Sequence, residues 1–203
     1  GLGSGTDGNG NFDVTVDATF MTSADDITFA TGSIDLANAA DLTVNTSNGN
    51  ISIGNIRGTA TASQVGEDVT LNAGTGTIAV ANVGNASAAE IGDIDYTAAT
   101  ITLSGGQYAT ADQDGAADAD TGTFESTGVT KISGDVTIST DVATGTNGTD
   151  EDGTIKFNGT GTIIGAGGTD NLTIASGKGV ITFGSTIGVS APLDGLVINS
   201  AGS

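Results

Sequence analysis

The sequence predicts an all-β fold, and within that class it favours a parallel β-helix, also called a β-solenoid. Three observations support this: short runs of alternating apolar and polar residues, turn-forming residues between the runs, and an internal repeat. Gly, Thr, Asn, Asp and Val dominate the chain and form helices poorly, whereas short strands joined by Gly, Asn and Asp turns fit this composition. An antiparallel β-sandwich shows the same alternation and stays open as the structural alternative.

Apolar residues recur at every second position along most of the chain, in strands of about 3–6 residues. The residues between them are mostly Thr, Ser or Asp, so that each strand has one apolar face and one polar face. In chain order, the alternating sets are Phe12/Val14/Val16, Ile27/Phe29, Ile34/Leu36, Leu42/Val44, Ile51/Ile53, Val69/Leu71, Ile78/Val80, Ile94/Tyr96, Ile101/Leu103, Val136/Ile138, Ile155/Phe157, Leu172/Ile174, Ile181/Phe183 and Leu196/Ile198.

The internal repeat begins with Asp or Asn and continues with an apolar residue, Thr and a second apolar residue. A Gly follows eight positions after the start, and an apolar pair occupies positions ten and twelve. The three clear copies are DLTVNTSNGNISIGNI from Asp41, DVTLNAGTGTIAVANV from Asp68 and NLTIASGKGVITFGSTI from Asn171. A fourth copy starts at Asp135 and is interrupted by an insertion before it resumes at Gly153.

Such a short unit cannot bury its own apolar face, so it must stack on neighbouring units. Each strand then pairs with its counterpart about 4.8 Å along the axis, and the inward positions form aliphatic ladders. Thr43, Thr70 and Thr173 are expected to point outward. The expected inward residues are Ile51, Ile53, Val69, Leu71, Ile78, Val80, Leu172, Ile174, Ile181 and Phe183.

The chain is expected to form one β-repeat domain over residues 12–203, after a flexible N-terminal leader at residues 1–11. Two acidic loop insertions are expected within this domain, near residues 109–125 and 140–153. Insertions in repeat proteins map to loops, usually on one face of the stack.

The repeats resemble those of large bacterial surface proteins and exoproteins. The similar families are filamentous-haemagglutinin-like adhesins, autotransporter passengers and β-strand repeat proteins. The pieces that carry this resemblance are DLTVNTSNGNISIGNIRG, DVTLNAGTGTIAVANVG and LTIASGKGVITFGSTIGVSAPLDGLVINSAG. The resemblance implies a secreted or surface-anchored stalk, adhesin or fibre, and it specifies no ligand.

Composition argues against several functional classes. The formal net charge is −20, with 24 acidic residues against 4 basic ones, which is unfavourable for binding nucleic acid or an anionic membrane surface. No apolar run is long enough for membrane insertion. The chain has no His and no Cys, which removes the usual nucleophile–base pairs and zinc ligands. We therefore expect a protein that is not an enzyme, with no catalytic residues.

Three acidic clusters are interpreted either as solvated loops or as Ca²⁺ sites, because Ca²⁺ takes 6–8 oxygen ligands from flexible loops. No other cofactor is expected. The candidate ligands are Asp7, Asn9, Asn11 and Asp13 in the first cluster, Asp112, Asp114, Asp118 and Asp120 in the second, and Asp150 and Asp152 in the third.

The leading functional hypothesis is a non-enzymatic structural protein, extracellular or at the cell surface. It would be a segment or subunit of a fibre, adhesin or surface layer, whose partners are copies of itself, end to end. The alternative is a pilus-like filament subunit that donates its N-terminal strand, residues 12–20, to a neighbour. A third hypothesis is a carbohydrate-binding or carbohydrate-cleaving β-helix with host or surface glycans as partners. Tyr96, Tyr108 and Phe124 could stack on a sugar, but three aromatics spread over this distance are more often packed in the core or in turns.

Overall fold

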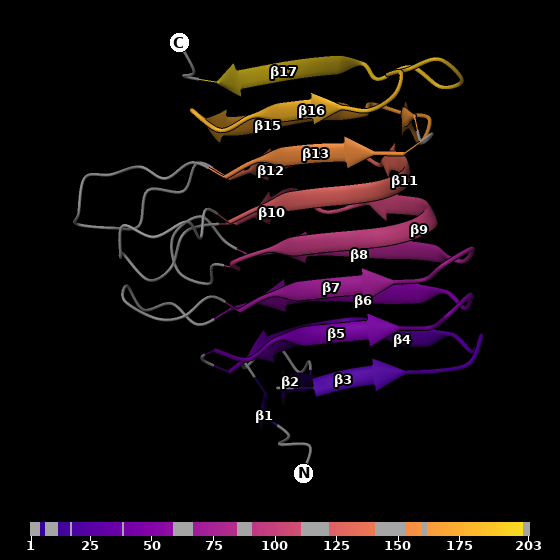
Figure 1. The fold of residues 1–203 in the computed structure, drawn as a ribbon, viewed down its shortest axis with the longest axis vertical. Coiled ribbons are helices and arrows are strands. Elements are labelled where there is room, and N and C mark those ends of the chain that lie inside the picture. The colour runs from indigo at the N-terminus through magenta and orange to yellow at the C-terminus, as the bar shows by residue number, and fades with distance from the viewer. Residues whose placement is uncertain are drawn as a thin grey trace, which may run out of the picture.

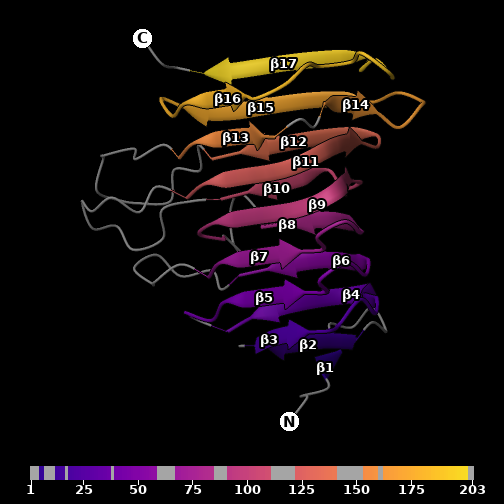
Figure 2. The same cartoon turned by 45° about the vertical axis from the view of Figure 1, so that its right-hand side comes forward.

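The computed structural model is an elongated parallel β-solenoid, shown in two side views in Figures 1 and 2. It describes residues 5–6, 12–16, 18–37, 39–58, 67–84, 91–110, 122–140, 153–159 and 162–200, and within these ranges there is no helix. All strand pairings are parallel except the short antiparallel pair β1–β2. The β-solenoid prediction is therefore confirmed, and the antiparallel β-sandwich is not the fold.

Seventeen strands form one continuous hydrogen-bonded sheet. They are β1 (Gly5–Thr6), β2 (Phe12–Val16), β3 (Ala18–Met21), β4 (Ile27–Leu36), β5 (Leu42–Asn45), β6 (Ile51–Arg57), β7 (Val69–Asn72), β8 (Thr77–Val83), β9 (Ile94–Leu103), β10 (Gln107–Ala109), β11 (Phe124–Ile132), β12 (Asp135–Ser139), β13 (Ile155–Asn158), β14 (Ile163–Gly165), β15 (Asn171–Gly177), β16 (Ile181–Phe183) and β17 (Gly195–Ser200).

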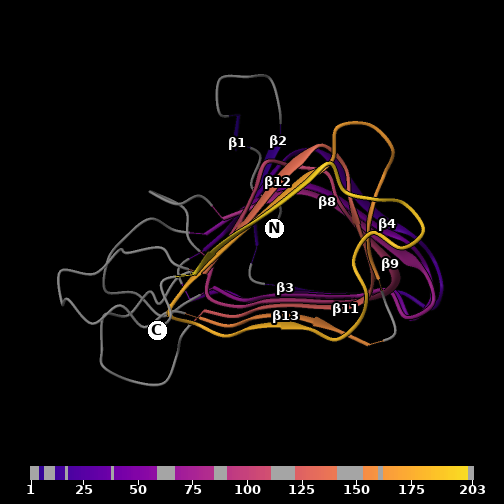
Figure 3. The ribbon, with the colours of Figure 1, turned by 90° about the horizontal axis from the view of Figure 1, so that it is seen from above.

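The strand registers divide the sheet into three faces, and the view from above in Figure 3 shows their triangular outline. The first face stacks β3, β5, β7, the start of β9, the start of β11, β13 and β16. The second face stacks the starts of β4, β6 and β8, the ends of β9 and β11, and β14. The third face stacks β2, the ends of β4, β6 and β8, then β10, β12, β15 and β17.

The interior of the triangle is filled by the predicted aliphatic ladders. Eight of the ten predicted inward residues are at most 3% exposed, namely Ile51, Ile53, Val69, Leu71, Ile78, Val80, Leu172 and Ile174. Ile181 and Phe183 pack against the core but are only half-buried, because β16 is the last strand on the first face. Thr70 is exposed, while Thr43 and Thr173 are half-buried on the outer surface.

Aromatic side chains form a connected column inside the later turns. Phe124 contacts Tyr96, Tyr108 and Phe157, with ring centroids 5.9–6.4 Å apart, and Phe157 stacks on Phe183 at 5.6 Å. Tyr96, Tyr108 and Phe124 are at most 1% exposed. The interpretation that these three aromatics pack in the core is therefore confirmed, and the alternative of stacking on sugars is wrong, because the rings are buried.

The repeat copies do not all occupy equivalent places. The copies from Asp41 and Asp68 begin first-face strands, β5 and β7, which stack on each other. The copies from Asp135 and Asn171 begin third-face strands, β12 and β15, which also stack on each other. The motif thus encodes a strand, a turn and a strand, and this unit bends around two different corners of the triangle.

The interrupted copy contains its insertion at the corner between the third and first faces. Thr140 ends the third-face segment and Gly153 leads into β13 on the first face, so residues 141–152 connect these two faces. The segments 59–66, 85–90 and 111–121 likewise fall between a third-face strand and the next first-face strand. The two expected acidic insertions themselves lie largely outside the described residues, and the ends of the first one, Ala109 and Phe124–Glu125, belong to β10 and β11.

Candidate functional site

The predicted calcium ligands lie outside the part of the chain that the structure describes in side-chain detail. Asp7, Asn9, Asn11, Asp112, Asp114, Asp118, Asp120, Asp150 and Asp152 fall in the undescribed ranges, and Asp13 is described only through its backbone in β2. Among the described residues, no group of three or more Asp or Glu side chains is placed to hold a metal ion.

The aspartates that open the repeats have a structural role at the corner before the first face. The Asp41 carboxylate accepts the backbone N–H of Asp68 at 3.3 Å, and the Asp68 carboxylate accepts that of Asp93 at 2.8 Å. The Asp93 carboxylate continues this ladder by accepting the N–H of Thr123. These side chains thereby satisfy backbone donors where the strand ladder begins. This structural role explains why Asp recurs at these positions without any bound ligand.

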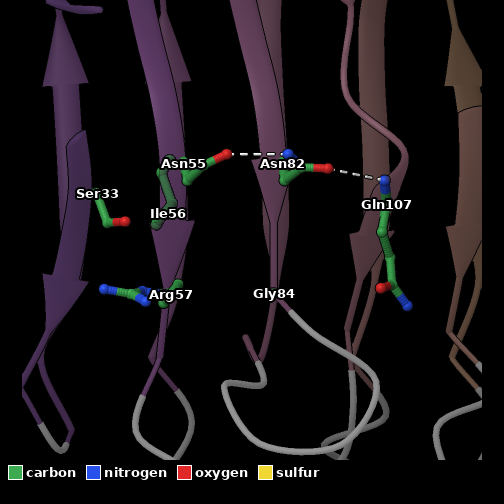
Figure 4. Close-up of a pocket in the computed structure, with 7 residues that line it drawn as sticks. All are labelled: Ser33, Asn55, Ile56, Arg57, Asn82, Gly84 and Gln107. Carbon is green, nitrogen blue, oxygen red and sulfur yellow. Dashed lines mark hydrogen bonds between the residues drawn. The ribbon is translucent and has the colours of Figure 1, made fainter. Parts of the chain in front are cut away.

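A groove of about 300 Å³ on the outer surface of the third face is the candidate functional site, shown in Figure 4. It crosses β4, β6, β8 and β10, and most of the side chains that line it are polar, while both polar and apolar atoms contribute to its surface. The residues that line it are Ser33, Asn55, Ile56, Arg57, Asn82, Gly84 and Gln107.

One edge of the groove is an amide ladder that runs across the strands. Asn55, Asn82 and Gln107 occupy the same outward position on successive turns, because Asn55 pairs with Asn82 and Tyr108 pairs with Val83. The Asn82 Nδ2 donates to Asn55 Oδ1 at 2.9 Å, and the backbone N–H of Gln107 donates to Asn82 Oδ1 at 3.1 Å. Figure 4 shows both bonds in one row.

An ion pair between Arg57 and Asp35 lies at the end of the groove that is nearer the N-terminus. Arg57 donates from Nε to Asp35 Oδ1 at 2.7 Å and from Nη2 to Asp35 Oδ2 at 3.0 Å, in a two-pronged arrangement. The two residues face each other because Asp35 in β4 pairs directly with Arg57 in β6. The pair fixes the guanidinium at the rim while 40% of the Arg57 side chain stays exposed.

Gly84 follows Arg57 along the third face, where its N–H donates to the Ile56 carbonyl at 3.0 Å, and it lines the groove. Its φ is +69°, a conformation that favours glycine. A Cβ at this position would lie 2.2 Å from the Ala109 carbonyl oxygen, so a larger residue would clash with the next turn. Glycine is therefore needed for the close approach of the Ala109 backbone, and Gly84 lies between Arg57 and Gln107 in the wall of the groove (Figure 4).

The groove offers hydrogen bonding without an evident catalytic group. Its lining contains amides, a hydroxyl and a guanidinium, but no carboxylate, His or Cys. Sequence reasoning missed this site because none of its residues forms a known motif. One signal was present: Asn55 and Asn82 occupy the same place in two repeat copies, in IGNI and VANV.

A second polar cluster lies on the first face. Asp95 pairs with Glu125 on the next strand, and Glu125 in turn pairs with Lys156, whose Nζ lies 3.7 Å from Glu125 Oε2. Partial loss of water raises the pKa of Asp95, and the nearby charges of Glu125 and Asp93 raise it further, while Lys156 acts in the opposite direction. In this row Asp95 is exposed and Glu125 and Lys156 are half-buried, and we interpret it as part of the solenoid wall.

No protein-family model matches the chain, and no match is found among curated proteins or among solved structures. Over the described residues, no helix has the length and apolar character needed to cross a membrane. Fold and site geometry are therefore the basis for the functional proposals.

Proposed function

We propose that this protein is a non-enzymatic structural protein, extracellular or at the cell surface, and that its solenoid is a segment or subunit of a fibre, adhesin or surface layer. Copies of the chain stack end to end. The observation that carries the proposal is the incomplete burial of inward-facing residues on the last strand, β17. Leu196 and Ile198 are 41% and 47% exposed, whereas their partners on β15, Leu172 and Ile174, are fully buried.

The opposite end presents apolar side chains on its first turn, although on the third face the short strand β1 already pairs with β2. Phe20 and Phe29 are half-buried in the first turn, with ring centroids 5.4 Å apart. Phe20 belongs to the same inward column of the first face as Phe183, through Val44, Leu71, Tyr96, Ser126 and Phe157. A second copy stacked in this register would place its Phe20 over Phe183 and continue the ladder that already holds each turn to the next.

Head-to-tail stacking of this kind joins two different surfaces, so it produces an open filament unless the rotation closes a ring. Burial of the exposed Leu and Ile side chains supplies the attraction, at roughly 25 cal/mol per Å² of apolar surface. Repulsion between copies of net charge −20 opposes association, and salt screens that repulsion over about 8 Å at physiological ionic strength.

The test is a concentration series of the full chain at low and at physiological ionic strength, followed by light scattering and electron microscopy. We expect oligomers that grow with concentration and with salt. Ile198→Asp should abolish them, because it places a charge on the end surface. Thr70→Asp is the matched control, since it adds the same charge to an exposed position in the middle of the solenoid.

A chain that stays monomeric under all these conditions would contradict end-to-end assembly. Equal loss of oligomers in Ile198→Asp and Thr70→Asp would also contradict it, because net charge and not the end surface would then control association.

The pairing of the first strands within their own chain gives the strand-donation alternative less support. That hypothesis needs residues 12–20 to be available to a neighbouring chain. In the structure β2 pairs with β4 and β3 pairs with β5 of the same chain, so this segment already forms the start of its own solenoid. The proposal therefore rests on end surfaces and not on a donated strand.

A further inference from the structure

We propose that the groove on the third face binds a neutral oligosaccharide that lies along the solenoid axis. This inference goes beyond the structural role above, because the groove lies on the side of the rod and does not involve either end surface. It is carried by the hydrogen-bonding groups of Ser33, Asn55, Arg57, Asn82 and Gln107, which line the groove.

Several polar groups in the groove remain available to a ligand. Within the described part of the chain, Ser33 Oγ, Asn55 Nδ2 and both side-chain polar atoms of Gln107 make no hydrogen bond to protein. Each of these side chains is half-buried, so it is partly ordered by its neighbours and still reachable. The site therefore offers both donors and acceptors, which sugar hydroxyls match because they donate and accept at the same atom.

The amide ladder holds these groups in place before a ligand arrives. Asn55 Oδ1 and Asn82 Oδ1 each accept a hydrogen bond from the next turn, at 2.9 and 3.1 Å, which fixes the amide planes. The Asp35–Arg57 pair fixes the guanidinium in the same way. Binding to fixed groups loses less conformational freedom than binding to mobile surface side chains.

The charge distribution favours a neutral ligand over an acidic one. Both carboxylate oxygens of Asp35 already face Arg57, so the guanidinium charge is largely compensated. The protein as a whole carries a net charge of −20, which repels anions. The lining exposes both polar and apolar atoms, although Ile56, its one apolar side chain, is itself buried.

The spacing of the ladder suits a chain of sugar rings. Asn55, Asn82 and Gln107 follow one another at the separation of neighbouring strands, about 4.8 Å. This separation is comparable to the advance per ring in an extended oligosaccharide, so that successive rings meet equivalent amides. Because the groove is open and lacks an aromatic platform, we expect weak binding, with a dissociation constant on the order of 0.1–1 mM.

The test uses the ¹⁵N-labelled full chain, with cellohexaose, maltohexaose and mannohexaose as neutral probes and a galacturonic acid hexamer as the charged probe. Titrations followed by NMR should shift the side-chain amide signals of Asn55, Asn82 and Gln107 with at least one neutral probe. Ile198→Asp can serve as the background, so that the result does not depend on whether the chain assembles.

Two variants examine the groove directly. Asn55→Asp keeps an oxygen for the Asn82 amide and removes the two free donors, while Gln107→Ala removes the side-chain amide. Each should weaken binding by about tenfold or more, which corresponds to about 1.4 kcal/mol. Asn199→Ala is the matched control, because Asn199 is an exposed amide on the same face but outside the groove.

The inference is overturned if none of the neutral probes shifts these amides at millimolar concentration. It is also overturned if the galacturonic acid hexamer binds and the neutral probes do not, since the site would then select a carboxylate. Unchanged affinity in both groove variants, or equal weakening in Asn199→Ala, would place the binding elsewhere.

Discussion

Thr140 and Gly153 are thirteen positions apart, yet they make the pair of hydrogen bonds that Thr46 and Gly49 make across a turn of three positions. In each pair the hydroxyl donates to the glycine carbonyl, at 2.7 and 2.6 Å, and the glycine N–H donates back to the threonine carbonyl. Ser176 and Gly179 repeat the arrangement at a third position. This reciprocal pair closes the corner whether two or twelve residues lie between its members.

The first prediction concerns the length of the connection between Thr140 and Gly153. Replacing residues 141–152 by Gly-Lys copies the turn between Ser176 and Gly179. The free energy of unfolding should rise by about 1–2 kcal/mol, because closing a shorter loop loses less chain entropy. Urea unfolding at equilibrium measures the change.

Thr140→Val is the companion variant for the same corner. It removes a buried hydroxyl that donates to the Gly153 carbonyl, and it should cost about 1–2 kcal/mol. Thr173→Val, on the half-buried outer surface, is the control and should change stability little. If the short-loop variant failed to fold, or Thr140→Val behaved like the control, the hydroxyl–glycine pair would not be what closes the corner.

The second prediction compares two isoleucines at the same position of the repeat motif. Ile78 is fully buried on the second face, and Ile181 is half-buried on the last strand of the first face. Ile78→Ala should destabilise the fold by about 2–5 kcal/mol, because it leaves a cavity in the ladder. Ile181→Ala should cost less than about 2 kcal/mol. Equal losses measured by urea unfolding would show that the end turn is as well covered as the middle.

The third prediction is a pH-dependent gain in stability from Asp95→Thr, which extends the outward column of Thr43 and Thr70. Since the pKa of Asp95 is raised on folding, its ionised form destabilises the folded state at neutral pH, and this penalty disappears as pH falls through the folded-state pKa. The variant should be more stable by ~0.2–1 kcal/mol near neutral pH, the size of a typical side-chain interaction between neighbouring strands.

The same comparison at about pH 3 should show a much smaller difference, because the Asp95 carboxyl is then mostly protonated in both states. Thermal unfolding of both proteins across this pH range gives the result. A gain that stays constant with pH would assign the effect to strand propensity instead of to charge.

The fourth prediction concerns calcium, and it depends on side chains outside the described ranges, among them Asp112, Asp114, Asp118 and Asp120. An ion that binds the folded form at 100 times its dissociation constant would add about 2.7 kcal/mol of stability. Melting temperatures should therefore be higher in calcium than in magnesium at matched ionic strength, and lowest with chelator. Equal melting temperatures in all three conditions would contradict the prediction that the folded protein binds Ca²⁺.

Much of the fold could be predicted from the sequence because inward and outward positions alternate with period two. Ile51, Ile78 and Leu172 are buried and Thr70 is exposed, as that pattern predicts. The alternation reports burial directly, since a shift of one residue would turn every apolar side chain to solvent. The repeat copies from Asp41 and Asp68 also indicated a stack, because their strands pair directly at a separation of 27 positions.

The candidate site could not be predicted, because its members meet through stacking distances that vary along the chain. Asp35 and Arg57 are 22 positions apart, Asn55 and Asn82 are 27 apart, and Asn82 and Gln107 are 25 apart. Asp135 and Asn171 stack across 36 positions, since a longer connection intervenes. Without a constant period, the sequence does not show which outward side chains become neighbours.

The sequence by itself determined the strand class, the inward side chains and the strong negative charge. Only the tertiary structure decided which corner each repeat copy turns, which polar residues line the third-face groove, and that Leu196 and Ile198 remain exposed at one end. The physical reason is that alternation and turn propensity act within a few residues. The location of a corner and the neighbours on a face depend on hydrogen bonding between turns, which the intervening loops set at irregular separations.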